Sequence, residues 1–218
     1  MRIRCKKWAK TELMECPFYI SNPTEQIGKW HALYSKKGPL HLELGCGKGT
    51  FIAKLASSHP EINYLAIDVV DSMLGLCKRN IEKEYHEKDL PINNIYITKH
   101  DIQRILLMCN EKDVVDRIYI NFCNPWPKNT QKKRRLTYTR QLEHYKVFLK
   151  QGGEIYFKTD DAALFKDSIS YLLEEGFTIG WKTENLHQEQ VPENIVTEHE
   201  KMFSEAGIPI KALIAIKK

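Results

Sequence analysis

The chain has 218 residues, of which 42% are hydrophobic and 28% charged, a balance that predicts one globular domain with a short appendage and excludes an intrinsically disordered chain. No run approaches the roughly 18 consecutive apolar residues of a membrane span, and the basic N-terminus lacks the apolar stretch of a signal peptide. The six cysteines occur singly, which indicates reduced thiols and neither a disulfide framework nor a metal site. We therefore expect a cytoplasmic protein without membrane or metal partners.

The net charge of +5 is concentrated in two short segments. Residues 1–10 and residues 128–135 each carry five Lys or Arg side chains and no acid. Clustered positive charge predicts a polyanion partner, because each neutralised phosphate releases counterions. On charge alone, two solvated segments explain the clusters equally well.

Short apolar runs alternate along the chain with longer amphipathic stretches, which predicts strands separated by helices. The expected strands are 40–44, 64–67, 95–98, 114–122, 153–158, 177–182 and 208–216. The expected helical stretches are 50–58, 71–85, 102–109, 138–149 and 162–175, with a short piece from Thr197.

This alternation predicts an α/β fold: a doubly wound, mostly parallel sheet of about seven strands with an antiparallel last strand. Residues 39–218 would form this domain. Residues 1–38 precede the first strand and are expected to form a basic N-terminal extension.

The first strand-to-helix turn carries three glycines, Gly45, Gly47 and Gly49, which let the backbone turn sharply and leave room for a ligand. Asp68 ends the next expected strand, where a carboxylate is placed to accept hydrogen bonds from ribose hydroxyls. Glu43 lies two residues before the first glycine, where it would repel a pyrophosphate and suit a positively charged ligand. The residues alone leave open a glycine-rich turn of some other α/β fold.

The E-x-G-x-G-x-G motif with its strand-end acid resembles motifs of the Rossmann-like, S-adenosylmethionine-dependent methyltransferases. That cofactor carries a sulfonium and an ammonium group, which accounts for acids near the loop. The resemblance implies that Glu43, the three glycines, Asp68 and Asp101 bind it, with Asp101 matching the family's acid near the adenine. A helix N-cap is the alternative for Asp101, and the two roles are compatible.

A rigid, basic loop follows the expected strand 114–122 and begins N-P-W-P-K at Asn124. Pro125 and Pro127 lack amide donors, and the loop lies where an α/β sheet binds its second substrate. Trp126 offers a flat face to a base, and the cations that follow offer contacts to phosphates. The alternative for Trp126 is a core aromatic at the sheet edge.

With P-W-P-K-x-x-x-x-K-R-R, the sequence closely resembles the bacterial tRNA (guanine-N7)-methyltransferases, from residue 1 to about residue 213. Further matches are the N-terminal M-R-x-R-x-K-x-W-A pattern, F-K-T-D ending at Asp160, and T-E-H-E beginning at Thr197. The family implies methyl transfer from S-adenosylmethionine to N7 of guanine 46 in the variable loop of tRNA. It also implies a cofactor role for residue 124. The residues implied for the tRNA guanine are Lys128, Asp160, Thr197, Glu198, His199 and Glu200. The residues implied to contact RNA are Thr130, Gln131, Lys132, Lys133, Arg134 and Arg135.

Two of these positions have structural explanations that the residues alone favour. Thr197-x-x-Glu200 has the pattern of a capping box, which closes the first turn of a helix. Asp160 is placed to cap the helix that begins near Ala162. Only the resemblance favours a role in binding guanine, and one residue can do both.

One departure from the family matters, because the family has Asp-Pro-Trp where this chain has Asn124-Pro-Trp. Asparagine keeps one acceptor, loses the negative charge and adds a donor. Asn124 is therefore both the catalytic candidate and the reason for two alternatives. One is a methyltransferase of exocyclic amines in nucleic acid, and the other is an inactive homologue that binds tRNA and cofactor without turnover. Monomer and homodimer are both compatible with the sequence.

Overall fold

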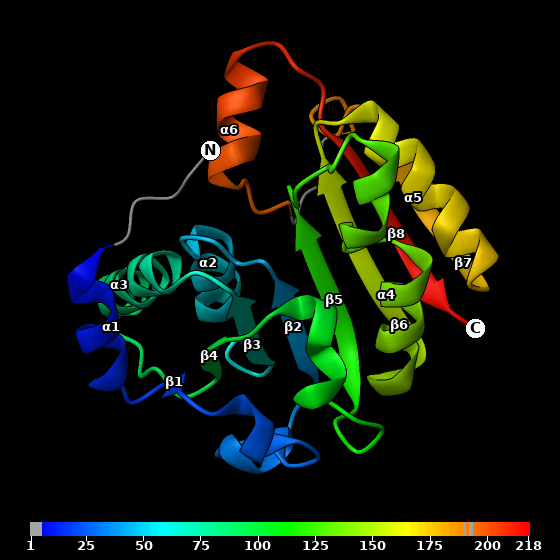
Figure 1. Cartoon of the computed structure of the whole chain (residues 1–218). Coiled ribbons are helices and arrows are strands. Elements are labelled where there is room, and N and C mark those ends of the chain that lie inside the picture. Colours follow the sequence, from blue (N-terminus) through cyan, green and yellow to red (C-terminus); the bar gives the residue numbers. More distant parts are fainter. Residues whose placement is uncertain (1–5, 190, 192–193) are drawn as a thin grey trace. The chain divides into compact units, whose positions relative to one another are not determined.

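The computed structural model describes residues 6–189, 191 and 194–218, so the first five residues of the basic N-terminal segment lie outside it (Figure 1). The chain splits into two compact units, the first ending at Asp113 and the second beginning at Val114.

The first unit contains parallel strands in the order β1-β4-β3-β2. Both β2 and β3 are buried along their whole length, as is typical of parallel strands that are covered on both faces. The strands are β1 (Tyr19–Ile20), β2 (Leu40–Leu44), β3 (Asn63–Asp68) and β4 (Ile95–Lys99), and the connecting helices are α2 (Thr50–Ser58) and α3 (Asp71–Glu87).

The N-terminal segment packs onto α3 through helix α1 (Lys7–Met14), as Figure 1 shows for the blue and teal helices. A Cβ atom added to Gly75 of α3 would lie 2.7 Å from the Cβ of Ala9, so glycine permits this close approach. The Arg79 guanidinium lies 3.7 Å from the ring centroid of Trp8, a cation–π contact. Two 3₁₀ helices follow, η1 (Pro23–Gln26) and η2 (Trp30–Leu33). The division of the chain into an extension and a domain at residue 38 stays a prediction.

The second unit contains strands in the order β5-β6-β8-β7. Strand β8 is antiparallel to both of its neighbours, and β5 and β6 are parallel. Helix α5 packs against β7 and β8. The elements are β5 (Val115–Asn121), η4 (Asn129–Arg134), α4 (Thr139–Phe148), β6 (Leu149–Thr159), α5 (Ala162–Glu174), β7 (Phe177–Thr183), α6 (Glu198–Glu205) and β8 (Lys211–Lys217).

The predicted α/β class, with mostly parallel strands and an antiparallel last strand, is confirmed. The described residues contain eight strands, because the N-terminal segment adds the two-residue β1 beside β4. Residues 102–109 differ from the expected regular helix: η3 (Ile102–Leu107) is a 3₁₀ helix interrupted at Arg104. Within the described ranges, no helix is both long and apolar enough to span a bilayer.

Candidate functional site

The glycine loop after β2 forms the candidate ligand site of the first unit. A Cβ atom at Gly49 would lie 2.2 Å from the Sγ of Cys77, so this glycine lets α2 begin against α3. At Gly47, where φ is +55°, an added Cβ would meet nothing within 4 Å. The two glycines therefore differ in purpose: one permits close packing, and the other supplies the turn and leaves open space for a ligand.

Asp68, the last residue of β3, closes this loop with its carboxylate. Its Oδ2 accepts a hydrogen bond from the Gly47 amide at 2.9 Å, and its Oδ1 accepts one from the Val70 amide at 2.8 Å. Burial raises the pKa of Asp68, and the hydrogen bonds from the two amides oppose that rise. An ionised carboxylate has about four acceptor positions, so these two bonds leave capacity for further donors such as ribose hydroxyls.

Two further predicted acids lie at the same edge of the first unit. The register places Asp68 opposite Lys99 at the end of β4, and Asp101 follows two residues later. Asp101 is exposed and caps η3 by accepting a hydrogen bond from the Gln103 amide at 3.0 Å, so the capping alternative is observed. Glu43, inside β2, is only 2% exposed. Acids and an open glycine turn at the carboxyl ends of neighbouring strands fit a ligand with hydroxyl groups and positive charge.

In the second unit, the loop after β5 is shaped by Asn124. Its side-chain oxygen accepts a hydrogen bond from the Trp126 amide at 3.1 Å, an Asx turn. Trp126 has φ of +43° and is half-buried, and the guanidinium of Arg134 lies 5.1 Å from its ring centroid. Trp126 is therefore not a core aromatic: it is a loop residue with a cation beside its ring.

The predicted RNA-contacting run divides into exposed, half-buried and buried members. Arg135 is the buried member: its side chain is 2% exposed and ion-paired with Asp167 of α5 at 2.6 Å. Lys132 is half-buried and pairs with the same carboxylate oxygen at 2.8 Å. Gln131 is half-buried, and the remaining members, Thr130, Lys133 and Arg134, are exposed. Lys128, which the resemblance assigns to the guanine, is also exposed.

The predicted Thr197–Glu200 segment begins helix α6, and the favoured capping box is confirmed there. The Thr197 oxygen accepts from the Glu200 amide at 3.0 Å, and the Glu200 carboxylate accepts from the Thr197 amide at 3.4 Å. Glu200 is fully buried and pairs with Lys158 of β6 at 3.1 Å, which ties α6 to the carboxyl end of that strand. Glu198 and His199 are exposed, and the His199 ring lies 5.7 Å from that of Phe122.

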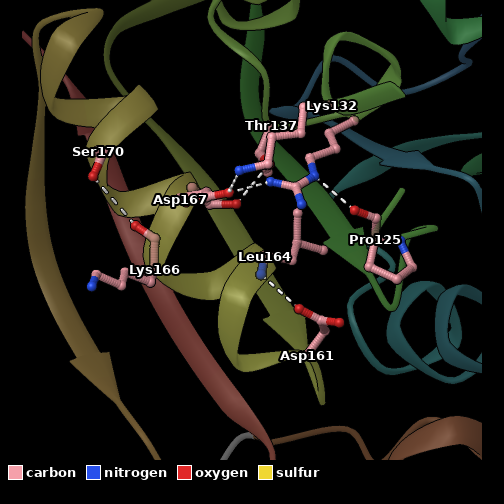
Figure 2. A network of polar contacts seen from close by, with 10 residues as sticks. Pro125, Lys132, Thr137, Asp161, Leu164, Lys166, Asp167 and Ser170 are labelled. Atoms are coloured by element: carbon pink, nitrogen blue, oxygen red, sulfur yellow. Dashed lines mark hydrogen bonds and ion pairs between the residues drawn. The ribbon is translucent and has the colours of Figure 1, made fainter. Parts of the chain in front are cut away.

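The expectation that Asp160 caps the following helix is wrong. Asp161 is the N-cap of α5, and its Oδ1 accepts from the Leu164 amide at 2.6 Å (Figure 2). Capping requires the residue immediately before the first helical position, and α5 begins at Ala162. Asp160 lies one position earlier, just past the end of β6, and its side chain is half-buried.

Two residues of this region carried no sequence signal. Asp167 lies in the middle of α5, where an aspartate reads as an ordinary helix-surface charge, yet it holds Lys132 and Arg135. Lys158 reads as an outward position of an alternating strand, yet it pairs with the buried Glu200. Both roles depend on partners more than 30 residues away in the chain.

Comparisons with known proteins agree with this geometry. The family model described as "Putative methyltransferase" matches residues 37–213. Among solved structures, a 16S rRNA methyltransferase, KamB, has a TM-score of 0.62 at 11% identity, covering 99% of this chain and 95% of that one. An antibiotic-related methyltransferase has a TM-score of 0.57 at 18% identity with the same coverage. These two structures show that the fold is the methyltransferase fold.

Curated relatives are much closer in sequence. The tRNA (guanine-N(7)-)-methyltransferase of Clostridium beijerinckii is 57% identical over 217 residues, covering 100% of this chain and 99% of its own. Those of Clostridium botulinum (strain Alaska E43 / Type E3) and Acetivibrio thermocellus are 53% and 49% identical, with full coverage of both chains. Identity at this level along the whole length shows that the chain belongs to the family of tRNA (guanine-N(7)-)-methyltransferases.

Proposed function

We propose that this enzyme transfers a methyl group from S-adenosylmethionine to N7 of guanine 46 in the variable loop of tRNA. The observation that carries the proposal is the Asp68 carboxylate, which holds the open glycine turn at Gly47 and keeps acceptor capacity toward a ligand. Family membership supplies the reaction, and the exposed cations of the second unit supply the RNA-binding character.

The first unit would bind the cofactor. S-adenosylmethionine supplies an electrophilic methyl group on a positively charged sulfur. Asp68 would accept hydrogen bonds from its ribose hydroxyls, and the open space at Gly47 would admit it against the backbone. Glu43 and Asp101 would add negative charge on the side of the loop where the ligand's positive groups lie.

Guanine N7 needs no general base. It is an exposed acceptor on the major-groove edge, and its lone pair is free at neutral pH. The protein's task is therefore to orient the purine and to stabilise the positive charge that develops on it. Asp160 would accept from the guanine N1 and N2 donors, and Lys128 would reach O6 or a phosphate. Asn124 would contribute an amide dipole where the family has a carboxylate.

Helix α6 would complete the guanine site from Thr197, Glu198, His199 and Glu200. Of these, the exposed Glu198 and His199 would touch the ligand, whereas the buried Glu200 pairs with Lys158 and holds α6 on β6. The exposed cations Lys128, Lys133 and Arg134 would bind tRNA phosphates. An enzyme with this substrate would act in the cytoplasm.

A methyltransferase of exocyclic amines is the second candidate. It would need the Asn124 oxygen to accept a hydrogen bond from the attacking amine, and that oxygen accepts from the Trp126 amide. That bond occupies one of the two acceptor positions of the amide oxygen, so family membership, and not this bond, favours the guanine reaction.

The test uses purified protein, methyl-labelled S-adenosylmethionine and unmodified tRNA, followed by digestion to nucleosides. We expect the label in 7-methylguanosine, and its loss when guanine 46 is replaced by adenine. Label in a methylated adenosine or cytidine would establish the amine reaction instead. Intact tRNA binding without any label would establish an inactive binding protein.

A further inference from the structure

We propose that Arg135 is a positioning residue: anchored by Asp167, it holds the Asn124-Pro125-Trp126 loop through the carbonyl of Pro125 and does not contact RNA. The inference deepens the proposed function, since this loop is the part of the second unit assigned to the guanine.

The contacts of Arg135 bridge the loop and helix α5. Figure 2 labels the two partners, Pro125 and Asp167. Its Nε donates to the Pro125 carbonyl oxygen at 2.7 Å, and its Nη1 donates to Asp167 Oδ2 at 2.6 Å. Lys132 donates to the same carboxylate oxygen at 2.8 Å, so Asp167 receives two cations. With its side chain 2% exposed, Arg135 presents almost nothing to a phosphate.

The chemistry of this contact requires arginine. A buried cation is costly unless it is both paired and hydrogen-bonded, and the planar guanidinium meets the two needs with two differently directed donors. A lysine could pair with Asp167 or reach Pro125, but its single nitrogen lies on a flexible stem and does not fix the two partners in one plane.

The Asn124-Pro125-Trp126 loop has few backbone amides available for contacts outside the loop. Pro125 and Pro127 lack amide hydrogens, and the amide of Trp126 is used within the loop by Asn124. Trp126 also has a positive φ of 43°, a conformation that persists only where the surroundings impose it. The Pro125 carbonyl is the loop atom that Arg135 holds, and Arg135 is in turn paired with Asp167 of α5.

A second contact strengthens the anchor. The hydroxyl oxygens of Thr137 and Ser168 lie 2.6 Å apart and are both buried. Arg135 and Thr137 thus bind two adjacent residues of α5, Asp167 and Ser168. The backbone around Arg135 is therefore held against the helix by a second side-chain contact.

The neighbouring Arg134 provides the contrast. It is exposed, with its guanidinium 5.1 Å from the Trp126 ring centroid. Two consecutive arginines therefore have different environments: Arg134 is accessible to RNA, and Arg135 is engaged inside the protein.

The test is the variant Arg135→Lys, with Lys146→Met as the matched control. Lys146 of α4 pairs with Glu175, just past α5, at 2.6 Å, so the control removes an ion pair of the same unit at a different place. Both proteins are labelled with 5-fluorotryptophan, and ¹⁹F NMR reads the four tryptophans separately. The Trp126 resonance is assigned with Trp126→Phe.

In Arg135→Lys we expect the Trp126 resonance to shift or broaden while the other three stay unchanged. We expect kcat for methyl transfer to fall by about 100-fold and KM for tRNA to change by less than about threefold, because misplacement of a loop affects orientation more than binding. Lys146→Met should leave the four resonances and both kinetic constants as in the wild type.

An unchanged Trp126 resonance would overturn the proposal. So would a rise in KM for tRNA equal to that of Arg134→Ala with an unaltered kcat, since Arg135 would then be an RNA contact. Loss of all four native resonances in Arg135→Lys would mean that this variant does not fold. The variant Asp167→Asn, which keeps the arginine, is then measured in its place and judged by the same criteria. The NMR measurement needs neither cofactor nor tRNA, so a wild type without methyl transfer would refute the proposed function and leave this inference to be judged by the Trp126 resonance.

Discussion

Asp68 and Gly47 are joined by a 2.9 Å hydrogen bond from the glycine amide to the aspartate Oδ2, which ties the end of β3 to the loop that follows β2. The same carboxylate is the group assigned to the ribose of the cofactor. The shape of the glycine turn and the binding of the ligand therefore depend on one side chain.

We expect Asp68→Ala to weaken S-adenosylmethionine binding by about 10- to 100-fold, the scale of hydrogen bonds to a charged group. The variant should also lose about 1–3 kcal/mol of unfolding free energy, because the Gly47 and Val70 amides lose their acceptor. Isothermal titration calorimetry and urea denaturation measure the two effects. Asp71→Ala is the control, since Asp71 lies three residues away and pairs with Lys99. Equal weakening by both variants would contradict the assignment.

Restoring the family's residue with Asn124→Asp should speed methyl transfer. A carboxylate oxygen can accept the same hydrogen bond from the Trp126 amide, so the turn is kept and only the charge is added. One electrostatic contact to the developing cation corresponds to a gain of about 10- to 1000-fold in the single-turnover rate. An unchanged rate would show that residue 124 shapes the loop and does not stabilise charge.

The stability of the second unit should depend on the ionisation of Asp167. Hydrogen bonds from Lys132, and then from Arg135, lower the pKa of Asp167 below its ordinary 3.8. The folded state binds the proton of Asp167 more weakly than the unfolded state does. The ionised carboxylate therefore adds to the free energy of unfolding above the ordinary pKa, and this stabilisation is lost as pH falls through the lowered pKa of the folded state. The difference in unfolding free energy between wild type and Asp167→Asn should be constant from about pH 7 to about pH 5 and shrink below about pH 4. Urea denaturation across this range checks it, and a difference that persists in acid would disprove the linkage.

Loss of the capping box should destabilise α6. Thr197→Ala removes the oxygen that accepts from the Glu200 amide and should cost about 1 kcal/mol, whereas Thr197→Ser keeps the acceptor. Hydrogen exchange of the α6 amides measures the local effect. If Thr197 also binds guanine, Thr197→Ala should raise KM for tRNA while Thr197→Ser does not. The capping assignment fails if serine and alanine raise amide exchange equally.

Two cysteines should resist alkylation in the native protein. Burial raises the pKa of the Cys123 thiol to about 12 and that of Cys16 to about 11. Since the thiolate is the nucleophile, a pKa this far above 8 leaves almost none of the Cys123 thiol reactive at pH 8. Mass spectrometry after brief iodoacetamide treatment should find both unmodified, and the same treatment in urea should label both. Rapid native labelling of Cys123 would show that the loop beside Asn124 opens.

The sequence predicted the core of the fold because its signals are local. Leu40–Leu44 and Thr50–Ser58 were both predicted with the bounds that the structure has. Apolar runs, helical periodicity and a glycine turn are all read from neighbouring residues. Together they predict the strand, loop and helix around the glycine turn that Asp68 closes. The same local reading gave the Thr197 capping box.

Local patterns failed where one residue or one distant partner decides the outcome. The N-cap of α5 is Asp161 and not Asp160, because α5 begins at Ala162, as the sequence predicts, and the cap is the residue directly before it. Strand β8 pairs with β6, and no local sequence pattern predicts which strands become neighbours in the sheet.

By itself, then, the sequence determined the class of fold, the glycine loop with its acids and the family, since each rests on short motifs. Only the tertiary structure decided which cations of the basic run face solvent. Arg135 turns inward because its partners, Pro125 and Asp167, are 10 and 32 residues away in the chain. A charge that is buried must find its partners in space, and their positions come from the packing of α5 and the loop, not from neighbours in sequence.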